Sequence, residues 1–137
     1  MKTVLLIEDS KFLRRAYERL LEKEGYRVIG AGDGEQALLS AREMHPDLII
    51  LDMLLPKIGG PEVLRSLKNA DLTSYIPVIV LSGMSDRNGA KLKREGACAF
   101  LEKGPLLDDP QPLLDAIKQN LGRGELAATV NDNVRAF

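Results

Sequence analysis

Short runs of apolar residues recur along the chain at intervals that fit the strands of a buried sheet. Three runs rich in Val, Ile and Leu lie at residues 4–7, 48–51 and 76–81, and two weaker runs lie at 26–29 and 97–101. A continuous run, unlike one that alternates with polar residues, indicates a strand that is covered on both faces. The pattern therefore predicts five strands of a parallel sheet placed between helices.

Apolar residues between these runs recur at helical spacing. The first such stripe ends before Gly25, a residue suited to the position just after a helix, and consists of Phe12, Leu13, Ala16, Leu20 and Leu21. Shorter stripes within residues 37–44 and 63–67, a more polar segment at 86–95 and a clear stripe at 113–121 predict four further helices. Because parallel strands joined by right-handed crossover helices form a doubly wound sheet, the predicted fold class is α/β with helices on both faces.

The length and composition indicate one globular domain. The chain has 137 residues, of which 45% are hydrophobic and 28% are charged, and its net charge of -1 gives no sign of a nucleic-acid partner. Its single cysteine cannot form an internal disulfide, and its first apolar run is too short for a signal peptide or a membrane span, so we expect a cytoplasmic protein. Residues 1–122 are predicted to form the domain, and residues 123–137 a flexible tail or a truncated linker.

Polar residues follow the predicted strands at their carboxyl ends. Glu8 and Asp9 come after the first apolar run, Asp52 after the third, Ser82 after the fourth and Lys103 shortly after the fifth. In an open parallel sheet the carboxyl ends of the strands share one edge, and ligand sites form at that edge. We therefore expect these five side chains to converge.

Three carboxylates in one place need a compensating cation. Like charges raise one another's pKa, so such a cluster stays ionised only when positive charge balances it. Oxygen ligands with no second His or Cys nearby favour a hard ion over Zn²⁺, and Mg²⁺ is the prediction, with Mn²⁺ as the alternative. Mg²⁺ commonly meets phosphate oxygens, which the Lys103 ammonium and the Ser82 hydroxyl are also suited to hold. The pocket is therefore predicted to serve phosphoryl transfer.

Four short stretches at these strand ends resemble the signature motifs of one protein family. They are Glu-Asp-Ser at 8–10, Ile-Leu-Asp-Met at 50–53, Val-Leu-Ser-Gly at 80–83 and Phe-Leu-Glu-Lys at 100–103. In order and spacing they are similar to the motifs of the receiver domain of bacterial two-component response regulators, and the resemblance extends over about residues 2–121. It implies a flavodoxin-like fold of five βα units and a chemotaxis-regulator-like signalling switch.

The resemblance also implies a role for each matching acidic residue. Asp52 would be the phosphoacceptor, which takes a phosphoryl group from a phosphohistidine on a sensor histidine kinase or a phosphotransfer protein. Asp9 and Asp52 would bind Mg²⁺ through their side chains and Leu54 through its backbone carbonyl. Glu8 would act on the metal ion through a water molecule.

The remaining motif residues would complete the switch. By the same resemblance, Lys103 would be the charge partner of the phosphoryl oxygens, and Ser82 would donate its hydroxyl to them as the switch residue. Phe100 stands at the aromatic switch position. Phosphorylation would shift the surface formed by the fourth helix, the fifth strand and the fifth helix, which an output partner protein would read. The implied protein is a switch rather than a turnover enzyme, and it binds no nucleic acid or membrane within this chain.

A departure from the family in the loop after Lys103 and two alternative functions stay open. The family usually has Pro directly after the Lys, whereas here Lys103 is followed by Gly104 and then Pro105, so we expect a trans bond after Lys103 and an altered loop. The first alternative is a receiver fold that acts as a phosphate-independent binding or scaffold module. The second is an Asp-nucleophile phosphatase of the haloacid dehalogenase type. Such enzymes carry their nucleophile after the first strand and a second Asp two residues later, whereas here the position two residues after Asp52 is Leu54.

Overall fold

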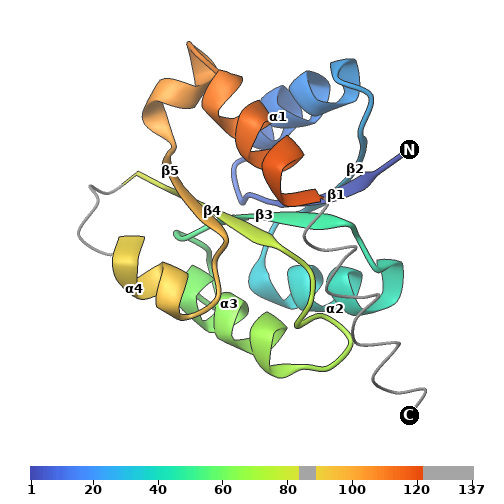
Figure 1. Ribbon diagram of the computed structural model, residues 1–137, viewed down its shortest axis with the longest axis vertical. Coiled ribbons are helices and arrows are strands. Elements are labelled where there is room, and N and C mark those ends of the chain that lie inside the picture. The colour runs from blue at the N-terminus through green and yellow to red at the C-terminus, as the bar shows by residue number, and fades with distance from the viewer. Residues whose placement is uncertain (84–88, 122–137) are drawn as a thin grey trace.

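The computed structural model describes residues 1–83 and 89–121, and strands and helices alternate along them (Figure 1). The order is β1 (Thr3–Ile7), α1 (Lys11–Lys23), β2 (Arg27–Ala31), α2 (Gly34–Met44), β3 (Leu48–Asp52), α3 (Gly60–Asn69), β4 (Val78–Ser82), α4 (Gly89–Arg94), β5 (Ala99–Glu102), the short 3-10 helix η2 (Gly104–Leu107) and a helix over residues 111–121. All five predicted strands are confirmed, and none of their ends differs from the prediction by more than two residues. They form one parallel sheet in the order β2-β1-β3-β4-β5.

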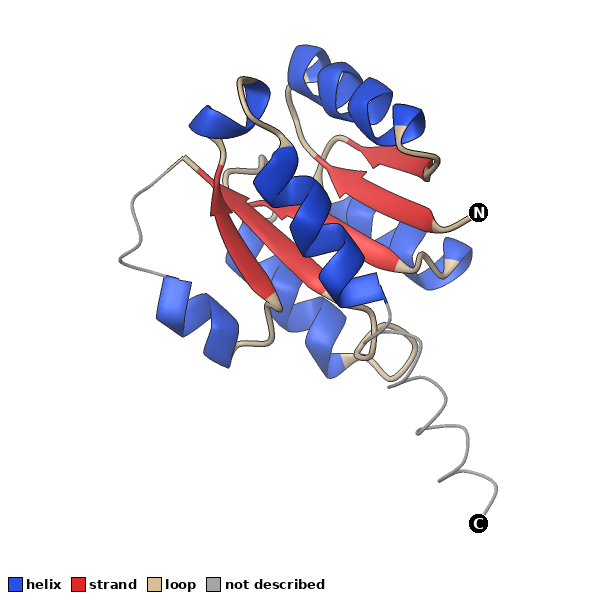
Figure 2. Ribbon diagram, turned by 45° about the horizontal axis from the view of Figure 1, so that its top comes forward, coloured by secondary structure: helices blue, strands red, loops and turns tan. Residues whose placement is uncertain are grey.

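Helices cover both faces of this sheet, and the α/β prediction is therefore confirmed (Figure 2). Leu5 and Ile7 of β1 pack with apolar residues of α2, α3 and α4. Val4 and Leu6 point to the opposite face and pack with α1 and the helix over residues 111–121. Every residue of β3 and β4 is buried, which explains why these two strands appear in the sequence as unbroken apolar runs.

The stripe predicted along α1 is partly confirmed, because Leu13 and Leu21 pack in the core and Phe12 does not. Phe12 is 78% exposed although it belongs to the predicted apolar stripe, whereas Tyr17, which was not part of that stripe, is buried together with Leu21. The helix begins after Ser10, whose hydroxyl accepts a hydrogen bond from the Leu13 backbone at 3.3 Å. Residues spaced four positions apart form two rows along this helix, one that contains Phe12 and one that contains Tyr17 and Leu21. The row with Tyr17 and Leu21 faces the sheet. Phe12 is therefore left on the solvent side of the first turn.

Two sequence predictions lie partly or wholly outside the described residues. The polar helix expected at 86–95 corresponds to α4, of which the structure describes Gly89–Arg94. The segment predicted as a tail, 123–137, is not among the described residues, so the division of the chain near residue 122 stays a prediction. None of the helices in the described ranges is long and apolar enough to cross a lipid bilayer.

Candidate functional site

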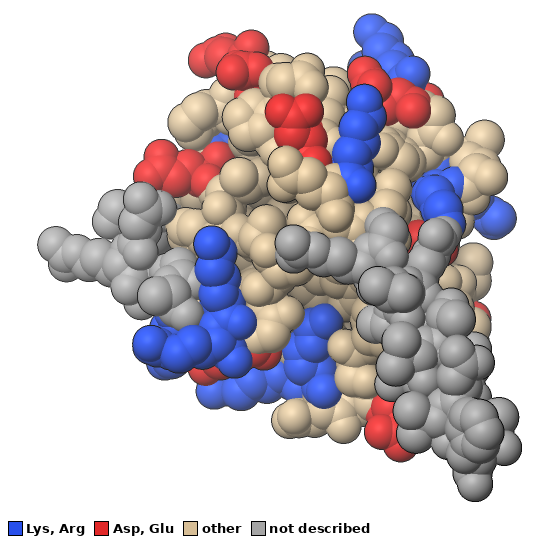
Figure 3. All heavy atoms as spheres, in the orientation of Figure 1, with Lys and Arg blue, Asp and Glu red and all other residues tan. Residues whose placement is uncertain are grey.

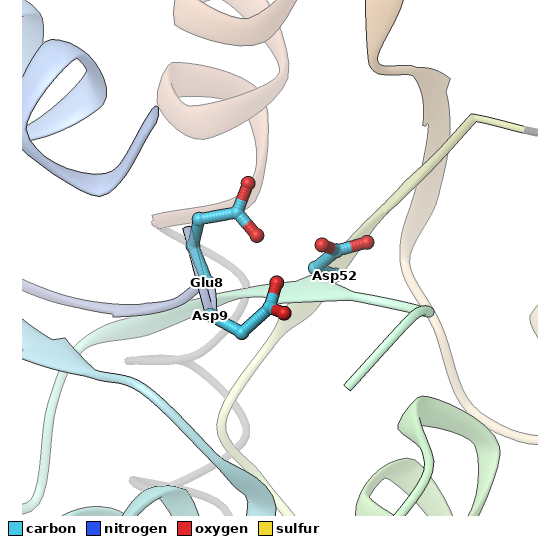
Figure 4. A group of neighbouring side chains, drawn as sticks. All are labelled: Glu8, Asp9 and Asp52. Carbon is cyan, nitrogen blue, oxygen red and sulfur yellow. The ribbon is translucent and has the colours of Figure 1, made fainter. Parts of the chain in front are cut away.

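Three carboxylates meet at the carboxyl edge of the two central strands. Glu8 and Asp9 directly follow β1 and Asp52 ends β3, and these strands pair with Ile7 opposite Leu51. One carboxylate oxygen of each of the three acids lies within 4.8 Å of the others (Figure 4). The convergence predicted for these three acids is therefore present in the structure.

Burial differs sharply among these acids. Glu8 and Asp52 are only 1% and 3% exposed, whereas Asp9 is open to solvent. Carboxylates are seldom buried so completely unless a cation or hydrogen-bond donors compensate them. The edge of the sheet thus concentrates negative charge in a place that water reaches from one side.

Lys103 supplies positive charge to this cluster. Its Nζ lies 2.7 Å from Asp52 Oδ2 and also forms an ion pair with Glu8 Oε1. Its backbone N–H donates to the carbonyl oxygen of Ser82 at 2.8 Å, which extends the pairing of β4 and β5 by one residue beyond Glu102. Ser82, 5% exposed at the end of β4, is thereby held beside Lys103.

The close packing of these charged groups shifts the pKa values of Glu8 and Lys103. The pKa of Glu8 is raised to about 7, chiefly by burial and also by the neighbouring Asp52 carboxylate, while Lys103 acts to lower it. Burial acts to lower the pKa of Lys103, but Asp52 and Glu8 outweigh it and hold that pKa above its usual value. The Lys103 ammonium therefore stays charged, and it is one positive charge against three acidic groups.

The donor set of this cluster fits a hard divalent cation. All the side-chain ligand atoms are carboxylate oxygens, the type that Mg²⁺ and Mn²⁺ prefer. In addition, neither oxygen of Glu8 has a hydrogen-bond donor of regular geometry within the described ranges, although both oxygens are buried. A hydrated cation satisfies such oxygens and balances the charge that Lys103 leaves uncompensated.

The loop after β3 brings backbone groups to the Asp52 carboxylate. The N–H of Leu54 donates to Asp52 Oδ1 at 3.2 Å, and the Leu54 side chain is 66% exposed. The loop returns closely to the strand, since a Cβ on Gly60 would lie 2.5 Å from the Cα of Met53. The predicted use of the Leu54 carbonyl as a metal ligand stays a prediction.

Phe100 lies outside the acidic cluster but close to Ser82 in the sheet. It pairs with Val80 across β4 and β5, and its half-buried ring packs against the core beneath α2, α3 and α4. Since Val80 also packs in that core and side chains alternate along a strand, Ser82 and Phe100 occupy the same face of neighbouring strands. This placement suits the predicted pair of switch residues.

The loop after Lys103 differs from the family pattern as the sequence indicated. Gly104, Pro105 and the two residues after them form the 3-10 helix η2. Every peptide bond in the part of the chain that the structure describes is trans, which includes the bond after Lys103.

Arg14 of α1 is a residue of the site that the sequence analysis missed. Its Nη1 donates to the backbone carbonyl of Glu8 at 2.6 Å and so holds the end of β1. The side chain crosses β2 where Gly30 and Gly32 leave room, because a Cβ on Gly30 would lie 3.1 Å from Arg14 Cδ. The only signal of this contact in the sequence is the pair Gly30 and Gly32, which leaves room for the arginine. This signal can be used only when it is known which strand lies against α1.

Comparison with known proteins adds independent evidence. Residues 4–129 match the family model of the response regulator receiver domain. The polar-differentiation response regulator DivK of Brucella ovis is 34% identical over 122 residues, which are 88% of this chain and 97% of that protein. The solved structure of the chemotaxis response regulator CheY4 of Vibrio cholerae is 28% identical with a TM-score of 0.78, over 87% of this chain and 98% of that chain.

A solved CheY-like receiver domain protein of Methanospirillum hungatei agrees, with a TM-score of 0.81 at 25% identity over 91% of this chain and 97% of that chain. An α/β sheet whose carboxyl edge carries buried acids and a paired lysine is the architecture of a phosphoacceptor domain in two-component signalling. The chain belongs to the response regulator receiver domain family. Members of this family typically bind Mg²⁺ at an acidic pocket and interact with a histidine kinase or a phosphotransfer protein. The resemblance to this family that the sequence motifs indicated is confirmed, as is its flavodoxin-like fold.

Proposed function

We propose that this chain is a phosphorylation switch in which Asp52 accepts a phosphoryl group from a phosphohistidine of a sensor histidine kinase or phosphotransfer protein. The observation that carries the proposal is the position of the Asp52 carboxylate. It is buried at the edge of the sheet, 2.7 Å from the Lys103 ammonium and within reach of the Glu8 and Asp9 carboxylates. No other described aspartate combines burial, a lysine partner and two acidic neighbours.

The proposed reaction needs no general base, because Asp52 attacks as a carboxylate. One of its oxygens forms a bond to phosphorus while the phosphorus–nitrogen bond to the donor histidine breaks, and the electron pair of that bond returns to the imidazole nitrogen. The demand on the protein is therefore positioning and charge neutralisation. The Leu54 N–H at Asp52 Oδ1 and the Lys103 ammonium at Oδ2 fix the orientation of the carboxylate.

Charge neutralisation falls to Lys103 and to the predicted metal ion. Asp9 and Asp52 would hold Mg²⁺ or Mn²⁺ by their side chains, Leu54 by its carbonyl and Glu8 through water, and the bound ion would supply positive charge to the phosphoryl oxygens. Lys103 shares its ammonium between Asp52 and Glu8 and is placed to turn toward the incoming oxygens. Ser82, next to Lys103 at the end of β4, would donate its hydroxyl to the same group.

The proposed output surface consists of α4, β5 and the helix over residues 111–121. β5 is an edge strand of the sheet, so its outer side is available to a partner. Ser82 and Phe100 share one face of the sheet with α4, which supports a path from the phosphoryl group to this surface. The exposed side of α4 is basic, with Lys91, Lys93 and Arg94, and Figure 3 shows Lys and Arg gathered over this helix.

The protein in this proposal is a switch that is modified itself, not an enzyme that turns over an external substrate. Its output partner is a protein, and no nucleic acid or membrane takes part within this chain. Since the phosphohistidine donors of two-component systems act in the cytoplasm, we place the chain there as well.

Intact mass spectrometry tests the proposal. The chain is incubated with a small acyl phosphate donor and Mg²⁺, and a gain of one phosphoryl mass is expected, which is lost in Asp52→Asn and when a chelator removes the metal. Asp71→Asn is the matched control, because Asp71 is an exposed aspartate between α3 and β4. If no phosphoryl group is gained and a beryllofluoride mimic does not bind, the phosphate-independent scaffold alternative is favoured.

A further inference from the structure

Tyr17 has a buried hydroxyl without a hydrogen-bond partner in the described part of the chain. The residue lies on α1, is 1% exposed and packs in the core between α1, the sheet and the helix over residues 111–121. Buried tyrosine hydroxyls normally have a partner, because removing an unpaired hydroxyl from water costs free energy. The polar end of this side chain therefore requires an acceptor or a water molecule nearby.

The alternation of side chains along the strands places the acidic pocket on the same side of the sheet as Tyr17. Val4 and Leu6 of β1 pack in the core that contains Tyr17, and Glu8 is the next residue in that alternation. The same holds for Asp52, which follows Ile50 of β3 at the same spacing. Figure 4 shows the Glu8 side chain directed to the side of the sheet that carries this helix layer.

Glu8 offers the acceptor that the Tyr17 hydroxyl lacks. Both carboxylate oxygens of Glu8 are buried, and neither receives a hydrogen bond of regular geometry from a described residue. The unpaired Tyr17 hydroxyl thus lies on the same side of the sheet as a buried carboxylate whose Oε1 is ion-paired with Lys103 and whose Oε2 has no described hydrogen-bond partner. Burial raises the pKa of the Tyr17 hydroxyl, and the charges of Lys103, Glu8 and Asp52 also act on that pKa, as expected of a phenol beneath this pocket.

We propose that the Tyr17 hydroxyl is a positioning group for the acidic pocket, linked to the Glu8 carboxylate through one buried water molecule. A water between the two satisfies the phenol and one Glu8 oxygen together, which is the usual role of a buried water. In this arrangement Tyr17 contacts Glu8 through the water molecule, and Lys103 contacts Glu8 directly as an ion pair. The consequence for metal binding rests on the proposed function, whereas the link between Tyr17 and Glu8 exists without the metal.

Thermal unfolding of the metal-free protein tests the link itself. Tyr17→Phe removes only the hydroxyl, and we expect the midpoint temperature to fall by about 3 °C, as loss of one buried hydrogen bond does in a domain of this size. In a Glu8→Met background the same change should leave the midpoint unchanged or raise it, because the acceptor is already gone. A rise in the wild-type background would overturn the proposal, since it would show an unpaired hydroxyl.

Calorimetric titration with Mg²⁺ tests the effect on the pocket. Tyr17→Phe should weaken Mg²⁺ binding about three- to tenfold, because the group that orients Glu8 is lost. Tyr26→Phe is the matched control, as Tyr26 is a half-buried tyrosine in the same core but outside the pocket, and its affinity should equal that of the wild type. Equal affinities in the Tyr17 and Tyr26 variants would overturn the positioning role.

A spectroscopic signal gives an independent readout. The chain has three tyrosines and no tryptophan, so Tyr26→Phe/Tyr75→Phe leaves Tyr17 as its single emitter. Addition of Mg²⁺ should change the Tyr17 emission, and Glu8→Met should abolish this change. If the emission stays constant while calorimetry shows that Mg²⁺ binds, the proposal is contradicted. If the wild type binds no Mg²⁺, the proposed metal site fails, and the unfolding cycle alone still decides whether Tyr17 and Glu8 are linked.

Discussion

Two half-buried lysines, Lys103 and Lys68, lie at opposite ends of the sheet and differ in what they bind. Lys103, just after β5, contacts the carboxylates of Asp52 and Glu8. Lys68, near the end of α3, donates to the backbone carbonyls of Ser74 and Ile76 at 3.2 and 2.6 Å, just before β4. Both side chains place an ammonium beneath the surface, but one meets charges and the other meets neutral oxygens.

The pKa values of the two lysines move in opposite directions. Burial lowers the pKa of Lys68, and among the described groups only the weaker effect of Cys98 opposes this. The two carboxylates at Lys103 overcome the effect of burial and raise its pKa. Lys68 thus completes the backbone hydrogen bonds of a turn, whereas Lys103 lies among acids whose oxygens remain only partly satisfied. Incomplete satisfaction, rather than burial, distinguishes the functional site from the structural one.

The largest effect is expected from Lys103→Met. Loss of the ammonium leaves the phosphoryl oxygens without their fixed positive partner, so the rate of phosphoryl uptake at Asp52 should fall about 100-fold or more. The rate is measured by quenched mass spectrometry with an acyl phosphate donor and saturating Mg²⁺. Lys68→Met is the control and should react at the wild-type rate. If Lys103→Met also reacts at that rate, Lys103 has no role in phosphoryl transfer.

Raising the pH should destabilise the metal-free protein. The pKa of Glu8 is about 7 in the folded chain and 4.5 as the reference value, so the folded state binds more protons between these pH values. The contribution of Glu8 to stability is therefore fully present below the reference pKa and is lost as the pH rises through the folded pKa. Urea unfolding in the presence of a chelator, from about pH 4 to about pH 8, measures this slope. Glu8→Gln should flatten the slope, and a wild-type slope of opposite sign would refute the burial of Glu8.

Lys68→Met should affect stability but not chemistry. Its loss removes two hydrogen bonds to the turn before β4, and we expect the free energy of unfolding to fall by about 1–2 kcal/mol. Chemical denaturation gives this value, with Lys93→Met as a control for an exposed lysine on α4. An unchanged stability would show that water replaces Lys68 at no cost.

The smallest effect is expected at a third lysine, Lys57, in the loop after β3. Its φ of 67° lies in the left-handed region, which disfavours every residue with a Cβ, and its 3.5 Å contact with Asp33 is exposed. Lys57→Gly should therefore raise the free energy of unfolding by about 1 kcal/mol. Lys57→Ala removes the same charge but keeps the Cβ, so it should bring no gain. A gain shared by both variants would assign the effect to charge.

The sheet and its acidic edge could be predicted from the sequence because both depend on local order. Continuous Val, Ile and Leu runs identify strands that are buried on both faces, as observed for β3 and β4. Parallel strands then fix the edge at which Glu8, Asp52 and Ser82 emerge, and the structure brings them there.

The orientation of α1 and the long-range contacts could not be predicted in the same way. The row with Phe12 and the row with Tyr17 have the same spacing, and only the packing of α1 on the sheet decides between them. The bonds of Arg14 to the Glu8 carbonyl and of Lys68 to the Ile76 carbonyl join different elements. They depend on tertiary placement, which no periodicity of apolar residues encodes.

The central claim is that Asp52, and no other acid of the cluster, carries the phosphoryl group. Borohydride reduces an aspartyl phosphate to homoserine, so peptide mapping after phosphorylation in Mg²⁺ and reduction identifies the modified position. The account predicts homoserine at position 52 alone, and none when Mg²⁺ is withheld. Reduction at position 9, or phosphorylated protein that yields no homoserine at position 52, would contradict it.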